Sequence, residues 1–169
     1  MSATARWEGK SLFVEDLRMT DLRFGASFLI WGFRHCAAGA AHCSVARRSY
    51  AMAFEGDEQA LAHLELLTTA IRDSGQRRIW FAPPACEQLT LDEACLLEAL
   101  EAAQTEQFEQ LNARLGELLA SAPSELVRRC AHTLAHTFRA RGFLIVAPGE
   151  HPSSQERGLA NGPQSHMIH

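Results

Sequence analysis

The chain has 169 residues, of which 47% are hydrophobic and 21% are charged. This length and composition are typical of a single domain that buries a core without disulfides or a structural metal, and they exclude a wholly disordered chain. The formal net charge of −4 offers no bulk attraction for nucleic-acid phosphates or anionic lipids. Neither a nucleic acid nor a membrane is therefore an expected partner.

The N-terminal part is expected to be a polar or extended segment, residues 1–19, before the helical domain. It lacks the apolar stretch of a signal peptide, which makes the cytoplasm the expected location. The most apolar run, residues 24–33, is bracketed by Arg23 and Arg34. Because a membrane span needs about 20 apolar residues, this shorter run is predicted to be a buried helix.

Helix signals follow one another through the first half of the chain. Thr20 and Asp21 offer an N-cap and a first-turn acid for the first helix, which is expected to reach about residue 38. An alanine-rich second helix is expected over residues 42–54. A third is predicted over residues 57–73, where apolar side chains recur at spacings of three and four.

A joint and then the longest predicted helix come next. Residues 77–81 lead into two prolines and are predicted to be an extended connector or a very short strand. Thr90-Leu-Asp-Glu93 has the form of a capping box, in which the threonine and the glutamate each bind an amide of the first turn. An apolar stripe with one polar member then predicts a single long helix, the spine of the fold. The stripe is Leu97, Leu100, Gln104, Phe108, Leu111, Leu115 and Leu118.

The last predicted helix ends at Gly142, which sits where a C-terminal cap belongs. The apolar run 143–146 is expected either to pair with residues 77–81 or to fill the core. From residue 148 to 169 the composition turns to Pro, Ser, Gln, Gly, His and Asn, which predicts a disordered tail. The expected fold class is all-α: a bundle of about five helices over residues 20–147 with a disordered C-terminal tail.

The densest group of metal-capable side chains is His35, Cys36, His42 and Cys43, two His-Cys pairs joined by small residues. Such a group would take zinc or another transition metal. Neighbouring residues on a helix point about 100° apart, so each pair supplies one easy ligand and two more must come from elsewhere. The competing interpretation makes the cysteines core residues, and no cofactor is then expected.

Three other groups contain residue types that can carry chemistry. His132 and His136 have the i, i+4 spacing of a metal pair, but both are expected on the solvent face of their helix. Cys86 lies in a proline-rich loop before a helix N-terminus, where a thiolate is favoured, and is the candidate redox residue. Three arginine doublets either converge in space or lie apart in surface salt bridges. They are Arg47-Arg48, Arg77-Arg78 and Arg128-Arg129.

Signatures of catalysis are absent from the sequence, which has no nucleophile elbow, glycine-rich phosphate loop or Glu-x-x-His motif. Glu93 is explained as a helix cap, and Asp92, Glu98 and Glu101 are expected to face solvent. An enzyme whose apolar pocket leaves no trace in the sequence stays open, but a protein without catalytic activity is the leading expectation.

Four stretches, taken together, carry a family resemblance. They are Arg34-His-Cys-Ala-Ala-Gly39, Ser74-Gly-Gln-Arg-Arg-Ile79, Ala82-Pro-Pro-Ala-Cys86 and Leu89-Thr-Leu-Asp-Glu93. In these stretches, over roughly residues 20–120, the chain resembles a family of uncharacterised small helical proteins from alphaproteobacteria. The resemblance implies a helical fold and carries over no catalytic residue. The family often has two cysteines where this chain has Ala85-Cys86, which weakens a thiol-based function.

The leading functional prediction is a non-enzymatic helical interaction or regulatory protein with an unidentified protein partner. Amphipathic helices and a flexible tail favour binding to another protein. A second copy of the chain, in a homodimer or other homo-oligomer, is one such partner. The alternative prediction is a metal- or redox-responsive protein that uses His35, Cys36, His42, Cys43 or Cys86.

Overall fold

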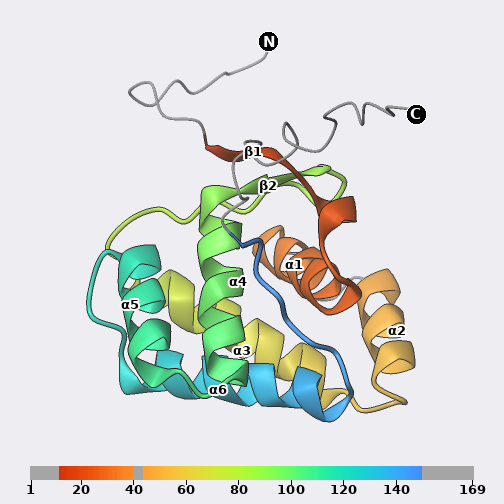
Figure 1. The fold of residues 1–169 in the computed structure, drawn as a ribbon. Helices are drawn as coiled ribbons and strands as arrows, with labels where there is room; N and C mark the ends of the chain where they lie inside the picture. Colours follow the sequence, from red (N-terminus) through yellow and green to blue (C-terminus); the bar gives the residue numbers. More distant parts are fainter. Residues whose placement is uncertain (1–11, 40–43, 150–169) are drawn as a thin grey trace, which may run out of the picture.

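The computed structural model describes residues 12–39 and 44–149, and the fold is mostly α-helical (Figure 1). The prediction of an all-α class is confirmed, with six α-helices in the described residues instead of about five. The elements are β1 (Phe13–Arg18), η1 (Met19–Asp21), α1 (Phe24–Ala37), α2 (Ser44–Ala53), α3 (Gln59–Ser74), β2 (Gln88–Thr90), α4 (Leu91–Gln104), α5 (Phe108–Leu119) and α6 (Glu125–Ala140). The described residues end at Gly149, so the predicted disordered tail lies outside them.

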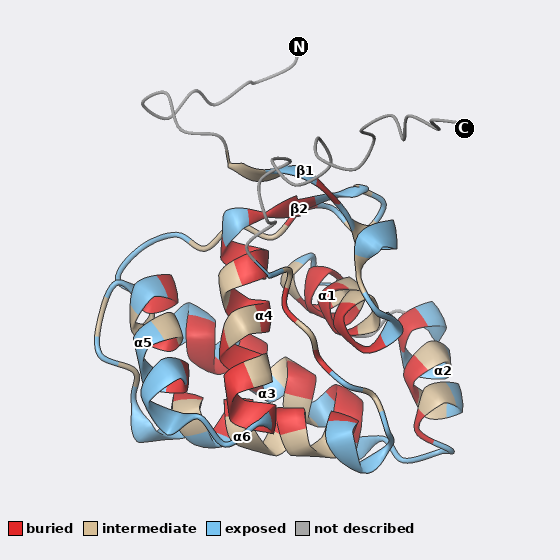
Figure 2. Ribbon diagram, viewed as in Figure 1, coloured by how far each residue is buried: buried red, intermediate tan, exposed pale blue. Residues whose placement is uncertain are grey.

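Helix α4 is the centre of the hydrophobic core. It stands upright in Figure 1, with α5 on one side, α1 on the other and α6 across its lower end. Its side chains are buried almost all the way round, as the red surface of this helix in Figure 2 shows. Leu96, Leu97, Ala99 and Leu100 are fully excluded from solvent. The spine of the fold is therefore α4 alone, one half of the long helix that the sequence predicted.

The long helix predicted from Thr90 to Leu118 is wrong, because the chain turns back between α4 and α5. Glu106, in the turn, adopts a positive φ of 60°, which no helix continues. The Thr105 hydroxyl donates to the Glu101 carbonyl at 2.9 Å and closes the end of α4. Phe108, predicted to lie on the buried stripe, is 57% exposed. The apolar spacing runs through the turn because both helices face the same core.

A two-stranded antiparallel sheet covers one end of the core (Figure 1). Phe13 lies opposite Thr90 and Arg18 opposite Gln88, so β1 has extra residues and is bulged. Asp16 in the bulge has a φ of 56°. The strand places buried Leu17 in the core, so the expected extended segment contributes to the domain.

Gln104, the polar member of the predicted stripe, is buried and fastens the segment after α6 to the core. Its side-chain amide donates to the carbonyls of Ala135 at 3.1 Å and Phe143 at 3.0 Å. Its carbonyl oxygen accepts from the Ile145 amide at 2.9 Å. Figure 1 shows this segment (blue) running between α1 and α4. Ile145 is only 2% exposed and lies in the core, one of the two predicted roles of the run 143–146, whereas Leu144 is 52% exposed.

Candidate functional site

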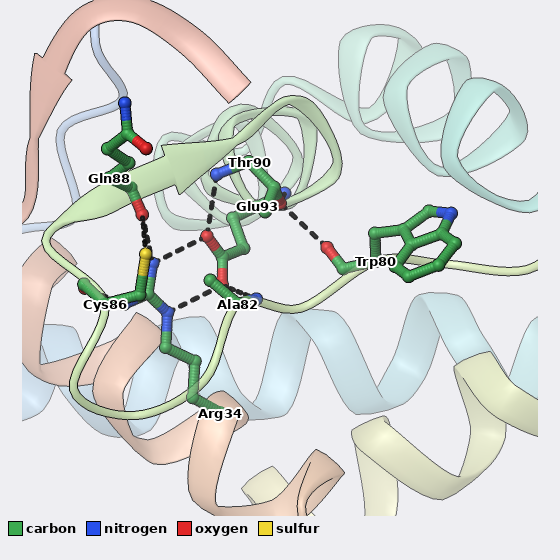
Figure 3. A network of polar contacts seen from close by, with 7 residues as sticks. All are labelled: Arg34, Trp80, Ala82, Cys86, Gln88, Thr90 and Glu93. Carbon is green, nitrogen blue, oxygen red and sulfur yellow. Dashed lines mark hydrogen bonds and ion pairs between the residues drawn. The ribbon is translucent and has the colours of Figure 1, made fainter. Parts of the chain in front are cut away.

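A fully buried ion pair joins α1 to α4. The Arg34 Nε donates to Glu93 Oε1 at 2.7 Å, and its Nη2 donates to Oε2 at 2.8 Å, so the pair is bidentate (Figure 3). Both side chains are 0% exposed. A buried pair of this kind is tolerated only when further hydrogen bonds satisfy both groups, because removing two charges from water costs several kcal/mol per ion.

The remaining donors of Arg34 bind the loop before α4. Its Nη1 donates to the Cys86 carbonyl at 2.5 Å and its Nη2 to the Gln88 carbonyl at 2.7 Å. Both carbonyls belong to the segment that links α3 to α4, which we call the connector, residues 75–90. The sequence offered Arg34 only as a flank of an apolar run, whereas the structure makes it the anchor of the connector.

The capping box predicted at the start of α4 is confirmed. The Glu93 amide donates to the Thr90 hydroxyl at 3.1 Å, and the Thr90 amide donates to the Glu93 carboxylate at 2.8 Å. The same two side chains also hold the connector. Thr90 donates its hydroxyl to the Trp80 carbonyl at 2.7 Å, and Glu93 accepts from the Ala82 amide at 3.0 Å (Figure 3). The capping box therefore both begins α4 and fixes the connector to it.

Asp92 was expected to face solvent, and the structure corrects this expectation, because the residue is only 9% exposed. Its carboxylate accepts two hydrogen bonds from the Arg77 guanidinium, at 2.5 and 3.1 Å, and one from the Trp80 amide at 2.7 Å. The hydrogen bonds that Arg77 donates to Asp92 raise the pKa of this guanidinium above its ordinary value. Arg78 thus lies between two points at which the connector is fixed.

The connector forms one wall of a cleft of about 340 Å³ against α1 and α3. Apolar side chains and three arginines share the lining, which consists of Ala37, Thr68, Ile71, Arg72, Arg77, Arg78, Ile79 and Phe81. Phe81 is held in place by stacking on Phe33 of α1, with ring centroids 5.8 Å apart. We call this feature the arginine cleft.

The charges of the arginine cleft are only partly balanced. Asp92 pairs with Arg77, but in the described part of the chain neither Arg72 nor Arg78 has an ion pair with a carboxylate. The Arg78 guanidinium lies 4.4 Å from the centre of the Trp80 ring, a cation-π arrangement that holds it. Two positive charges remain without a countercharge, although the chain as a whole is acidic.

Of the arginine doublets in the sequence, only one contributes to the cleft. Arg77-Arg78 meets Arg72 of α3, while the other two doublets are not among its lining residues. The signal that could have indicated this arrangement is short-range. Arg72 occupies the last turn of α3, and the chain folds back immediately after Gly75.

The predicted metal group is only half within the described residues, since His42 and Cys43 lie outside them. The ring of His35 packs on Trp31, with centroids 4.3 Å apart, and its Nδ1 is buried without a hydrogen-bond partner in the described chain. Cys36 is buried in the core. Within residues 12–39 and 44–149, no three histidine, cysteine or acidic side chains are placed to hold one metal ion.

Three thiols are poor nucleophiles: those of Cys36 and Cys130, which are buried, and that of Cys95, which is half-buried. Burial raises the pKa of Cys36 to about 11 and that of Cys95 to about 12, and it also raises the pKa of Cys130. A thiol must ionise to attack or to bind a metal, so these three are unreactive near neutral pH. Cys86, the candidate redox residue, is half-buried in the connector, with its sulfur 3.7 Å from the Gln88 carbonyl oxygen (Figure 3).

The raised pKa of Cys36 predicts a loss of stability in alkali. Above pH 9 the unfolded chain releases this proton, while the folded chain keeps it up to about pH 11. The free energy of unfolding is therefore highest below the pKa of the unfolded chain. It falls by roughly 2 kcal/mol as the pH rises through this window. Urea unfolding between pH 8 and 11 under reducing conditions measures this slope. Cys36→Ala should make the slope shallower, and an unchanged slope would contradict the assignment.

His132 and His136 were expected on the solvent face of α6, but the structure places both half-buried. Their rings lie 4.1 Å apart, and Phe108 of α5 stacks on His132 with centroids 6.2 Å apart. The Nε2 of His136 is buried without a hydrogen-bond partner in the described chain. The sequence could not show the contact of Phe108 with His132, because it arises only after the turn that ends α4.

Fold and site together define a mostly helical protein with a cationic cleft beside its core. Comparison with models of protein families, with curated proteins and with solved structures gave no match. Among the described helices, none is both long and apolar enough to cross a lipid bilayer. The function therefore has to be argued from the geometry of the cleft.

Proposed function

We propose that this chain is a non-enzymatic helical interaction or regulatory protein that binds an anionic partner at the arginine cleft. The observation that carries this proposal is that Arg72 and Arg78, both exposed, line the cleft without a carboxylate partner among the described residues. Guanidinium groups bind carboxylates and phosphates through paired hydrogen bonds, and they are less strongly hydrated than ammonium groups. A partner that supplies acidic groups replaces the missing countercharge.

The rigid connector supports this proposal. Arg77 and Trp80 are held by Asp92, and Arg78 rests on the Trp80 ring. A side chain that is already ordered loses less conformational freedom when it binds, which leaves more of the interaction energy as affinity. The buried pair of Arg34 and Glu93 keeps the rest of the connector in place.

The chemistry of the lining favours binding over catalysis. Arginine stays protonated in proteins and cannot serve as a general base. The one hydroxyl of the lining, on Thr68, already donates to the Leu64 carbonyl at 2.8 Å. The other lining side chains are apolar. The cleft thus holds an anion but offers neither a base nor an activated nucleophile.

Titration with small anions, followed by NMR, tests the proposal. At low ionic strength, benzoate and phenyl phosphate should shift the side-chain Nε–Hε signals of Arg72 and Arg78, because these groups donate to the bound anion. Arg72→Gln combined with Arg78→Gln should weaken binding at least about tenfold. Arg47→Gln combined with Arg48→Gln removes the same two charges from exposed positions outside the cleft and serves as the control.

Two results would contradict the proposed function. One is the absence of any shift at the cleft with either anion. The other is equal weakening by the Arg47→Gln, Arg48→Gln control, which would mean that the anions respond only to the overall charge of the protein.

A further inference from the structure

We infer that the arginine cleft takes a phosphate monoester, a small molecule with a dianionic phosphate group on an apolar body. This inference rests on the proposed function and narrows it to one class of ligand. It follows from three properties of the cleft: its unbalanced charge, its donor groups and its apolar floor.

Charge is the first property. Arg72 and Arg78 leave two positive charges unbalanced after Arg77 is paired with Asp92. A phosphate monoester carries close to two negative charges above its second pKa of about 6, whereas a carboxylate or a sulfate ester carries one. Only the dianion neutralises the cleft.

Donor geometry is the second property. The two unpaired guanidiniums come from different elements, Arg72 from α3 and Arg78 from the connector. Each is a planar fork of N–H donors, and a phosphate monoester has three terminal oxygens that accept from more than one fork at a time. A carboxylate has only two oxygens in one plane, so it matches one fork in the paired geometry and presents no third oxygen to a second.

The third property is the apolar floor of the cleft, together with its small volume. A volume of about 340 Å³ is at the lower end for pockets that hold small molecules, so the cleft suits a compact ligand. Ile71, Ile79 and Phe81 give it an apolar floor that inorganic phosphate leaves uncovered. Burying an apolar body on this floor adds affinity, at roughly 25 cal/mol per Å² of apolar surface removed from water.

Calorimetry with four probes at pH 7.5 and low salt tests the inference. Phenyl phosphate should bind at least about tenfold tighter than phenyl sulfate and benzoate, which carry one charge, and tighter than inorganic phosphate, which has no apolar body. Arg72→Gln and Arg78→Gln should each remove this preference for the dianion. Arg48→Gln should retain it.

Lowering the pH to 5 provides a second readout. Phenyl phosphate then becomes a monoanion, and its advantage over phenyl sulfate should disappear. Phenyl sulfate keeps one charge throughout and reports any titration of the protein itself. The ionisable groups around the cleft are Arg72, Arg77, Arg78, Asp92, Cys36 of α1, Glu65 of α3, Cys95 of α4 and Glu117 of α5.

The possible results separate this inference from the proposed function. If benzoate and phenyl phosphate bind equally well at the cleft, the phosphate assignment is overturned and the proposed function stands. If no probe binds there, both are overturned. A preference for phenyl phosphate that survives both Arg72→Gln and Arg78→Gln would place the phosphate elsewhere and overturn the inference as well.

Discussion

Glu93→Gln is expected to lower the free energy of unfolding by about 3 to 5 kcal/mol, because it leaves the buried guanidinium of Arg34 without a countercharge. Glutamine has nearly the shape of glutamate, so the loss reports the missing charge and not a cavity. Urea unfolding followed by circular dichroism at pH 7 measures it. Amides of the connector should also exchange faster with solvent, since Glu93 holds the Ala82 amide.

An exposed pair in the same region provides the matched control. Arg18 and Glu87 form an ion pair at 3.1 Å, with side chains 65% and 73% exposed. Glu87→Gln should cost less than about 1 kcal/mol, because water already screens that pair. If Glu93→Gln costs no more than Glu87→Gln, the interpretation of the buried pair is wrong.

Replacing both partners of the buried pair tests whether the loss of stability comes from the unpaired charge. Arg34→Met combined with Glu93→Leu should cost less than the sum of the two single changes, because no buried charge is then left alone. The double variant should still be less stable than the unchanged protein, since the carbonyls of Cys86 and Gln88 lose their donor. Stability equal to the sum of the single changes would show that the two side chains are not coupled.

Gln104→Leu is the second change with a large expected effect, a loss of about 3 kcal/mol. Leucine fills a similar space but cannot bind the Phe143 carbonyl or the Ile145 amide, and each buried group left without a partner costs about 1 to 3 kcal/mol. Chemical unfolding measures the total. Hydrogen exchange of the Ile145 amide, which donates to the Gln104 side chain, should accelerate as well.

Gln110→Leu is the control for this change. Gln110 is exposed on α5, and the substitution should alter stability by no more than about 0.5 kcal/mol. Equal effects at the two positions would contradict the role assigned to Gln104. An unchanged exchange rate at Ile145 would contradict it independently.

Much of the fold followed from local signals in the sequence. The capping box from Thr90 to Glu93 has the predicted hydrogen bonds, and α3 occupies nearly the predicted residues. These features depend on neighbours three or four residues apart, so the sequence contains them directly. The turn at Glu106 was missed because an apolar spacing of three and four continues across it, and spacing alone does not register a reversal of direction.

The candidate site was less accessible from the sequence. Arg34 and Gln104 stood out as polar residues within apolar stretches, but nothing local indicated what they bind. Arg78 was visible as part of an arginine doublet, but nothing in the sequence linked it to Arg72. Their meeting in one cleft depends on the fold of the connector, and that depends in turn on hydrogen bonds to Asp92 and Glu93 of another helix.

The sequence by itself therefore determined the helical class, the approximate places of most helices and the cap that begins α4, because propensity, periodicity and capping act over a few residues. Only the tertiary structure decided which polar side chains are buried and which charges stay unbalanced. Arg34 finds its partner Glu93 fifty-nine residues away. The physical reason is that desolvation and pairing depend on what surrounds a group in space, and distant segments supply those surroundings only once the chain has folded.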